Sequence, residues 1–177
     1  MQEQSYTITV FTADQAGLLS RVVGIFNRRN LNIDSLTTSQ SSDPDIHRFT
    51  IVVRVTEEMV KKLVAQLDKQ VDVLKSFYYT DEEVVYQEIA LYKIPIKVFQ
   101  DGDSVELLIR RHNARVLLIE REYVVVEKTG HEFEVDALLR EFKTVGIYEF
   151  VRSGRVAIVK PMERLNSYLA TLRSGVN

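Results

Sequence analysis

The residues best placed for chemistry are a glycine and two asparagines around one apolar segment, FTADQAGLLSRVVGIFNRRNLNIDSL. Gly17 stands directly before residues of helical spacing that begin at Leu18. A glycine places no side chain in front of the free N–H groups of a helix start, which attract a carboxylate together with the helix dipole. An amino acid offers one carboxylate, and its ammonium needs a carbonyl or a side-chain acceptor. One glycine is a weak motif, so Gly17 either holds a carboxylate or only eases a tight turn.

The polar residues on both sides of this helix have structural uses beside a possible role in binding. Asp14 lies where it could cap the start of the helix. Asn30 suits a left-handed residue after the helix end better than a ligand-binding residue. Asn32 is predicted to begin a strand, where asparagine is disfavoured, so its side chain is expected to contact either the turn or a ligand.

Other chemistries find little support. The chain has no cysteine, which excludes disulfides, thiolate catalysis and cysteine-bound metals. His47, His112 and His131 lack a second ligand at metal spacing and are predicted to be exposed polar residues. The segment TADQAGLLSR has a single glycine and no lysine, unlike phosphate loops. No serine, histidine and acid set is recognisable in the sequence, while a triad assembled in space stays open.

Composition restricts the class of partner. The net charge is -2 over 177 residues, so no broad basic field is present to bind nucleic acid. The uncharged apolar runs are far shorter than a membrane span, and the segment MQEQSYTITV lacks the pattern of a secretory signal. We therefore expect a cytoplasmic protein that binds neither nucleic acid nor membrane.

The first half of the sequence alternates between strand and helix patterns in a familiar order. Strands are expected at residues 5–11, 31–39, 48–55 and 71–79, with helices from Leu18 and from Thr56. The order strand, helix, strand, strand, helix, strand is that of a ferredoxin-like βαββαβ domain. Its two helices would cover one face of the sheet and leave the other face and the edges free for a partner.

The second half repeats this order after the charged segment TDEEVVYQ, so we predict domains at residues 1–80 and 81–177. Strands are expected in EIALYKIPI, ARVLLIE, EYVVVEK and GIYEFVRSGRVAIVK, the last broken at Ser153–Gly154. Helices are expected in DSVELLIRRH, in EFEVDALLREFK and from Pro161 onward. The fold class is therefore α+β, with two tandem ferredoxin-like domains.

Five segments in order carry a resemblance to a known family. They are GLLSRVVGIFNRRNLNIDSLT, SDPDIHRFTIVV, LDKQVDVLK, EIALYKI and VRSGRVAI. The first half resembles an ACT domain, a small-ligand regulatory module. From Gly17 to Ile158 the chain resembles the regulatory (small) subunit of acetohydroxyacid synthase, also called acetolactate synthase.

The resemblance implies a non-catalytic homodimer that binds the large catalytic subunit, activates it and transmits feedback inhibition, usually by valine. Thiamine diphosphate, magnesium and FAD belong to the large subunit, so no cofactor is expected in this chain. In the family, valine lies between two ACT domains of a dimer. Matched onto this sequence, the backbone at Gly17, Leu18 and Leu19 would hold the carboxylate, and Asn32 and Ile33 would come from the partner chain.

Asp14 departs from the family pattern, which commonly has asparagine there. An asparagine can donate a hydrogen bond to a carboxylate, whereas an ionised aspartate only accepts. Asp14 could instead pair with the ligand ammonium or cap the helix. Two other functions stay open from the sequence: a free-standing amino-acid sensor that controls another enzyme or a transcription factor, and a small enzyme on the same scaffold.

Overall fold

A computed structural model describes residues 2–100 and 104–160 of the chain. The described residues form two compact units, the first from the N-terminus to Tyr86 together with Ala157–Lys160, and the second from Gln87 to Val156. The helix expected from Pro161 lies outside the described residues.

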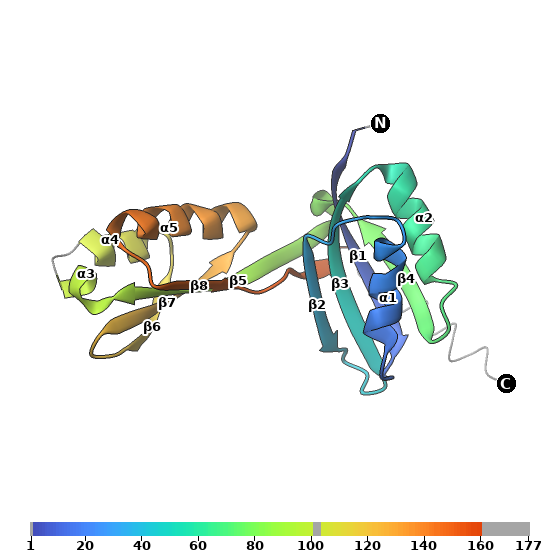
Figure 1. The fold of residues 1–177 in the computed structure, drawn as a ribbon, viewed down its shortest axis with the longest axis horizontal. Helices are drawn as coiled ribbons and strands as arrows, with labels where there is room; N and C mark the ends of the chain where they lie inside the picture. Colours follow the sequence, from blue (N-terminus) through green and yellow to red (C-terminus); the bar gives the residue numbers. More distant parts are fainter. Residues whose placement is uncertain (1, 101–103, 161–177) are drawn as a thin grey trace. The chain divides into compact units, whose positions relative to one another are not determined.

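The first unit is an antiparallel sheet with two helices on one face (Figure 1). Its elements are β1 (Gln4–Ala13), α1 (Leu18–Asn27), β2 (Ser35–Gln40), β3 (Ile46–Val55), α2 (Glu57–Leu67) and β4 (Val73–Tyr79). The strand order β2-β3-β1-β4 confirms the predicted ferredoxin-like plan. The core contains the apolar stripes of both helices and alternate residues of the central strands: Tyr6, Ile8, Val10, Val22, Ile25, Phe26, Ile51, Val53, Val60, Leu63 and Leu67.

The second face of this sheet is also covered, contrary to the prediction that it would be free. Thr7, Thr9 and Phe11 alternate with the core residues of β1 and are nevertheless buried. Two strands from later in the chain, β5 (Val84–Pro95) and β9 (Val156–Val159), pair with each other. Their side chains at Val84 and Ala157 form an apolar cluster with residues of β4. The sequence pattern did not show this because the covering strands were assigned to the second domain.

The second unit repeats the plan of the first. Its elements are β5, α3 (Ile96–Gln100), α4 (Ser104–Arg111), β6 (Arg115–Ile119), β7 (Tyr123–Gly130), α5 (Glu132–Val145) and β8 (Glu149–Arg152). The strand order β6-β7-β5-β8 corresponds to that of the first unit, and α4 and α5 lie on one face (Figure 1). Pro95 ends β5 as expected, whereas the short helix α3 was not predicted. The charged segment after Thr80 is ordered as a short 3-10 helix, η1 (Asp81–Glu83), followed by the start of β5.

Tyr92 connects the central strand of the second unit to its long helix. The ring is fully buried between Phe142 and Phe150, with centroid distances of 5.3 and 5.2 Å. Its hydroxyl donates a hydrogen bond of 2.8 Å to the carbonyl oxygen of Val135 in α5. Burial raises the pKa of the Tyr92 phenol, so the hydroxyl keeps the proton that it donates.

Tyr92→Phe should lower the free energy of unfolding of the second unit by about 1–2 kcal/mol, because the Val135 carbonyl loses its side-chain donor in a buried place. Urea unfolding followed by tyrosine fluorescence measures this change. Tyr123→Phe, the same change on a half-buried residue of β7, is the control and should change the free energy of unfolding by less than half as much. Equal effects of the two variants would contradict a role for the buried hydrogen bond.

Candidate functional site

The start of α1 is open to a ligand. Gly17 is the N-cap, with a left-handed backbone at φ 85° and ψ -7°, and no side chain of the described structure caps the helix there. A Cβ built at Gly17 would meet no heavy atom of the described residues within 4 Å. Asp14 is therefore not the N-cap, which corrects one of the two uses expected from the sequence. The left-handed angle explains the glycine, since other residues adopt it at a cost.

The starts of α2 and α5 carry acidic or capping side chains that the start of α1 lacks. Thr56 accepts a hydrogen bond of 3.3 Å from the N–H of Met59 at the start of α2, and Glu57 and Glu58 lie in its first turn. At the start of α5, the Glu134 carboxylate accepts from the N–H of His131 at 2.8 Å. Of these three helices, α1 alone starts with neither an acidic residue nor a capping side chain. Its first N–H groups and the positive end of its dipole thus remain available to an anion.

The two leucines after Gly17 differ in exposure. Leu18 is buried and anchors the first turn of α1 in the first unit. Leu19 is 41% exposed and places an apolar side chain next to the free N–H groups. A small molecule with both a carboxylate and an apolar group fits such a surface better than an inorganic anion does.

Asp14 lies near this helix start but has a partner of its own. Its carboxylate is 3.3 Å from Nε2 of His47 on β3, and its N–H donates to the carbonyl of Asp45 at 3.2 Å. The side chain is well exposed, so the pair is weak and depends on a protonated histidine. A carboxylate in this loop disfavours a second carboxylate at Gly17 and favours an ammonium.

Asn32 and Ile33 lie beyond the opposite end of α1. The Asn32 amide donates to the Asp34 carboxylate at 3.2 Å, and its side chain is exposed. Strand β2 begins only at Ser35, so the prediction that Asn32 begins a strand is wrong. Asn30 is left-handed at φ 54°, as predicted. Together Asn27, Asn30, Leu31 and Asn32 line an open polar hollow at this end of the helix.

The two groups of predicted site residues are therefore not adjacent within one chain. Gly17, Leu18 and Leu19 begin α1, and Asn32 and Ile33 follow its end. A helix of 10 residues is about 15 Å long, more than the reach of one amino acid. A site that uses both groups requires two copies of the chain.

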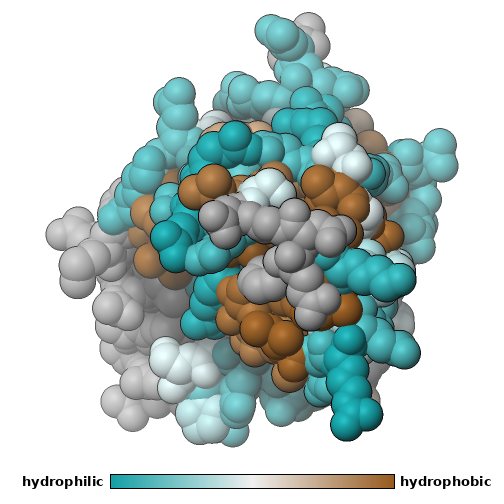
Figure 2. Space-filling model, turned by 90° about the vertical axis from the view of Figure 1, so that its left-hand side faces the viewer, coloured by the Kyte–Doolittle hydropathy of each residue, from teal (hydrophilic) through white to brown (hydrophobic). Residues whose placement is uncertain are grey.

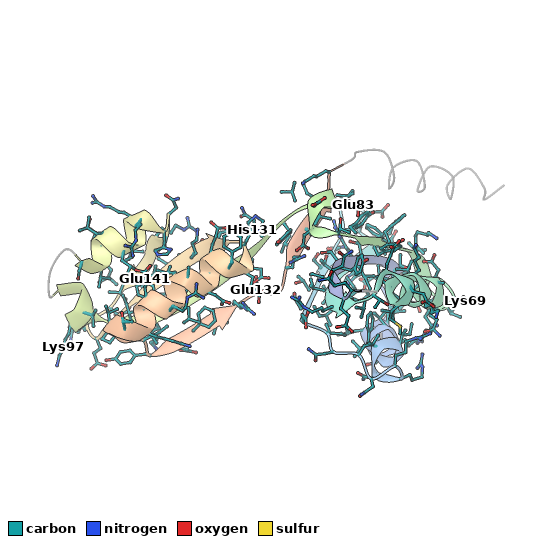
Figure 3. All side chains as sticks on the ribbon, turned by 90° about the horizontal axis from the view of Figure 1, so that it is seen from above. Lys69, Glu83, Lys97, His131, Glu132 and Glu141 are labelled. Atoms are coloured by element: carbon teal, nitrogen blue, oxygen red, sulfur yellow. The ribbon has the colours of Figure 1, made fainter. Side chains whose placement is uncertain are left out.

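The histidines do not form a metal site. Among residues 2–100 and 104–160, no group of three or more His, Asp and Glu side chains could hold a metal ion. His112 is not an exposed polar residue, because Nε2 lies 2.7 Å from the carboxylate of Glu141 and its side chain is only 15% exposed. That hydrogen bond, with the nearby Arg111, lowers the pKa of Glu141. His131 precedes α5, and Glu141 lies farther along the same helix (Figure 3).

Arg48 is a charged residue near the site that sequence reasoning missed. It follows His47 on β3, its guanidinium lies 5.7 Å from the centre of the Phe11 ring, and Nη2 donates to the carbonyl of Ala157. Burial lowers the pKa of Arg48. Arg48 occupies a polar position in the alternation of RFTIVVRV, so nothing in the sequence indicated that it would be covered. Through Arg48, the strand that contacts the Asp14 loop also holds β9.

No helix in the described part of the chain has the length and apolar character needed to cross a membrane.

Comparison with known proteins gives matches along both units. Residues 8–75 match the family described as AHAS small subunit-like ACT domain, and residues 87–161 match that of the small subunit of acetolactate synthase. The chain is 34% identical over 155 residues to a probable acetolactate synthase small subunit of Archaeoglobus fulgidus, covering 88% of this chain and 96% of that protein. It is 32% identical over 166 residues to the acetolactate synthase small subunit of Bacillus subtilis, covering 93% and 96%. The fold is similar to a crystal structure of the acetolactate synthase small subunit of Thermotoga maritima, with a TM-score of 0.81, 24% identity and coverage of 89% and 98%.

Gly17→Ala should lower the free energy of unfolding of the first unit by about 1 kcal/mol, because alanine disfavours a left-handed backbone. Gly17→Asn should cost less, since asparagine tolerates this conformation. Thermal and urea unfolding of both variants measure the difference. Equal stability of the alanine variant and the natural chain would show that residue 17 does not adopt a left-handed conformation.

Proposed function

We propose that this chain, which belongs to the family of acetolactate synthase small subunits, activates the large catalytic subunit and transmits feedback inhibition by valine. It acts in the cytoplasm as a homodimer and is not itself an enzyme. Thiamine diphosphate, magnesium and FAD are proposed to bind to the catalytic subunit rather than to this chain.

The single observation that supports the proposed effector site is the uncapped start of α1 directly after Gly17. Its free N–H groups suit the carboxylate of valine, and the exposed side chain of Leu19 suits the isopropyl group. Leucine and isoleucine carry the same groups, so the branched-chain amino acids as a class fit this surface.

The partner chain is proposed to complete the site. Asn32 is exposed and can turn its amide oxygen to the ammonium of valine, while Ile33 adds apolar contact. The separation of these residues from Gly17 within one chain supports a site that is shared across the dimer. Binding would then favour one arrangement of the two copies.

Valine would inhibit the enzyme if the catalytic subunit is less active when bound to the dimer arrangement that valine favours. Valine shifts the population only as far as its affinities for the two states differ. Reconstitution tests the whole proposal: the purified chain should raise acetolactate formation by the catalytic subunit, and valine should lower it again. Absence of any effect on that enzyme would contradict the proposal and favour a free-standing sensor.

Gly17→Asp should raise the valine concentration that half-inhibits the reconstituted enzyme about tenfold more than Gly17→Asn does. The reason is that the aspartate places a negative charge next to the ligand carboxylate. The two variants have nearly the same size and share the left-handed backbone, so their difference reports the charge. Activation without valine should persist in both. Equal valine inhibition of the two variants would contradict a carboxylate site at Gly17.

Asp14→Asn should tighten valine binding about fivefold, because it removes one exposed carboxylate close to the bound one. Isothermal titration of the purified chain with valine measures the affinity. His47→Gln, which removes only the partner of Asp14, is the control and should change the affinity little. Weaker binding by Asp14→Asn would show instead that Asp14 holds the ammonium.

A further inference from the structure

We infer that β9 is a releasable strap, which leaves the second face of the first sheet while the rest of the first unit stays folded. The strap consists of residues 156–160, that is, β9 and the following Lys160. The chain passes between the two units twice, at residues 86–87 and, within the strap, at residues 156–157. The inference goes beyond the proposed function and does not use the effector site, so the two can fail independently.

Few side chains hold the strap on the first unit. Ala157 is the one buried residue of β9, and it joins the apolar cluster that this layer forms with β4. Val159 packs against the same cluster but is only partly buried. Alanine buries a very small apolar side chain, so its departure exposes little apolar surface to water.

The outward side of the strap has no packing partner among the described residues of its own unit that would bury it. Val156 and Ile158 alternate with Ala157 and are 62% and 60% exposed. Exposed apolar side chains are common on this chain, and Figure 2 shows hydrophobic side chains at the surface between hydrophilic ones on one side of the molecule. The two outward residues therefore add little to the stability of the closed strap.

The end of the strap is fastened by contacts that water can replace. The Lys160 N–H donates to the carbonyl of Glu83 at 2.9 Å, and its Nζ donates to the carbonyl of Glu82 at 2.6 Å. The second of these bonds is exposed. A hydrogen bond to an exposed group contributes little net free energy, because water offers the same partner once the bond is broken.

The sheet face beneath the strap is compatible with water. On the helix side, the paired residues Ile8 and Ile51 of the central strands are apolar and fully buried. On the second face, Thr7, Thr9 and Thr50 are buried at the neighbouring positions of the same strands. A threonine hydroxyl can donate to and accept from water, whereas an exposed isoleucine loses its burial outright. Uncovering the second face thus costs less than uncovering the first.

Arg48 is the residue that opposes the closed state. Its guanidinium is partly buried on the second face, beside the Phe11 ring and the carbonyl of Ala157. No carboxylate among residues 2–100 and 104–160 forms an ion pair with it, and its Nε is buried without a hydrogen-bond partner there. Burial lowers the pKa of Arg48, as expected for a cation that its neighbours do not fully compensate.

Release of the strap hydrates this cation. The hydrogen bond to Ala157 contributes to the closed state, but a carbonyl and an aromatic ring compensate a buried charge less completely than a carboxylate does. When the strap leaves, water reaches the Arg48 guanidinium, and this gain offsets the loss of the few contacts of Ala157. The chain thereby has two states of similar free energy, and in the open state the later passage between the units is no longer attached to the first sheet.

Thiol labelling of the full-length chain measures release, because the chain has no cysteine of its own. Ala157→Cys places a reporter on the buried side of the strap, and Ile158→Cys places one on its exposed side. Val53→Cys is the control. Val53 is fully buried on the helix side of the same sheet, so its labelling requires unfolding of the first unit.

A maleimide should label Ala157→Cys about a hundredfold more slowly than Ile158→Cys, as for a strap that is open about 1% of the time. It should label Ala157→Cys at least about tenfold faster than Val53→Cys, because the strap opens without unfolding of the unit. Urea unfolding of each variant gives the labelling expected from unfolding alone. Labelling of Ala157→Cys at the rate of either of the other two variants would overturn the inference.

The charge of Arg48 is tested in the Ala157→Cys background. Arg48→Met keeps an unbranched apolar stem and removes the charge, so the open strap gains no hydration and labelling at position 157 should slow about fivefold. Arg48→Lys, which keeps a charge, is the matched control and should stay within about twofold of the natural residue. Faster labelling with Arg48→Met would show that Arg48 only clamps the strap and would overturn the inference, as would equal rates for the two variants. None of these measurements requires valine or the catalytic subunit.

Discussion

The packing of α1 on the first sheet holds the proposed effector site in place. Leu18, Val22 and Phe26 are buried on one side of this helix, so neither its position nor its ends can shift without exposing apolar surface. The last residue before the helix is therefore held at a fixed point, and there the chain turns through a left-handed glycine. An uncapped helix start is costly to bury but harmless at a surface, where water or a ligand can satisfy its N–H groups.

The two units solve the same packing problem with different results. In each unit, two helices cover one face of the sheet, as the ferredoxin-like order requires. In the first unit, β5 and β9 also cover the second face, and Arg48 holds the carbonyl of Ala157. In the second unit, the described residues leave an apolar face uncovered. Exposed apolar surface of this kind often marks a site where a partner binds.

A regulatory subunit needs a ligand site that is connected to the rest of its fold. The loop with Asp14 contacts His47, and the next residue of the same strand, Arg48, contacts β9. These contacts connect the loop physically to β9. Energetic coupling between the two is a separate property that has to be measured. The loop with Asp14 and strand β9 thus both contact β3 of the first sheet.

The sequence by itself determined the order of the strands and of the longer helices, the starts of α1 and α2, the left-handed Asn30 and the family. These properties depend on periodicity, capping residues and short motifs, all of which are local along the chain. The tertiary structure alone decided that Gly17 rather than Asp14 precedes α1 as its cap, that β2 starts at Ser35, and that His112 is shielded beside Glu141. It also decided which sheet face is covered, because that depends on β5 and β9 meeting across more than sixty residues of sequence. The proposed effector site depends on both: the sequence suggests its residues, but their separation to opposite ends of α1 is visible only once the length and position of the helix are known.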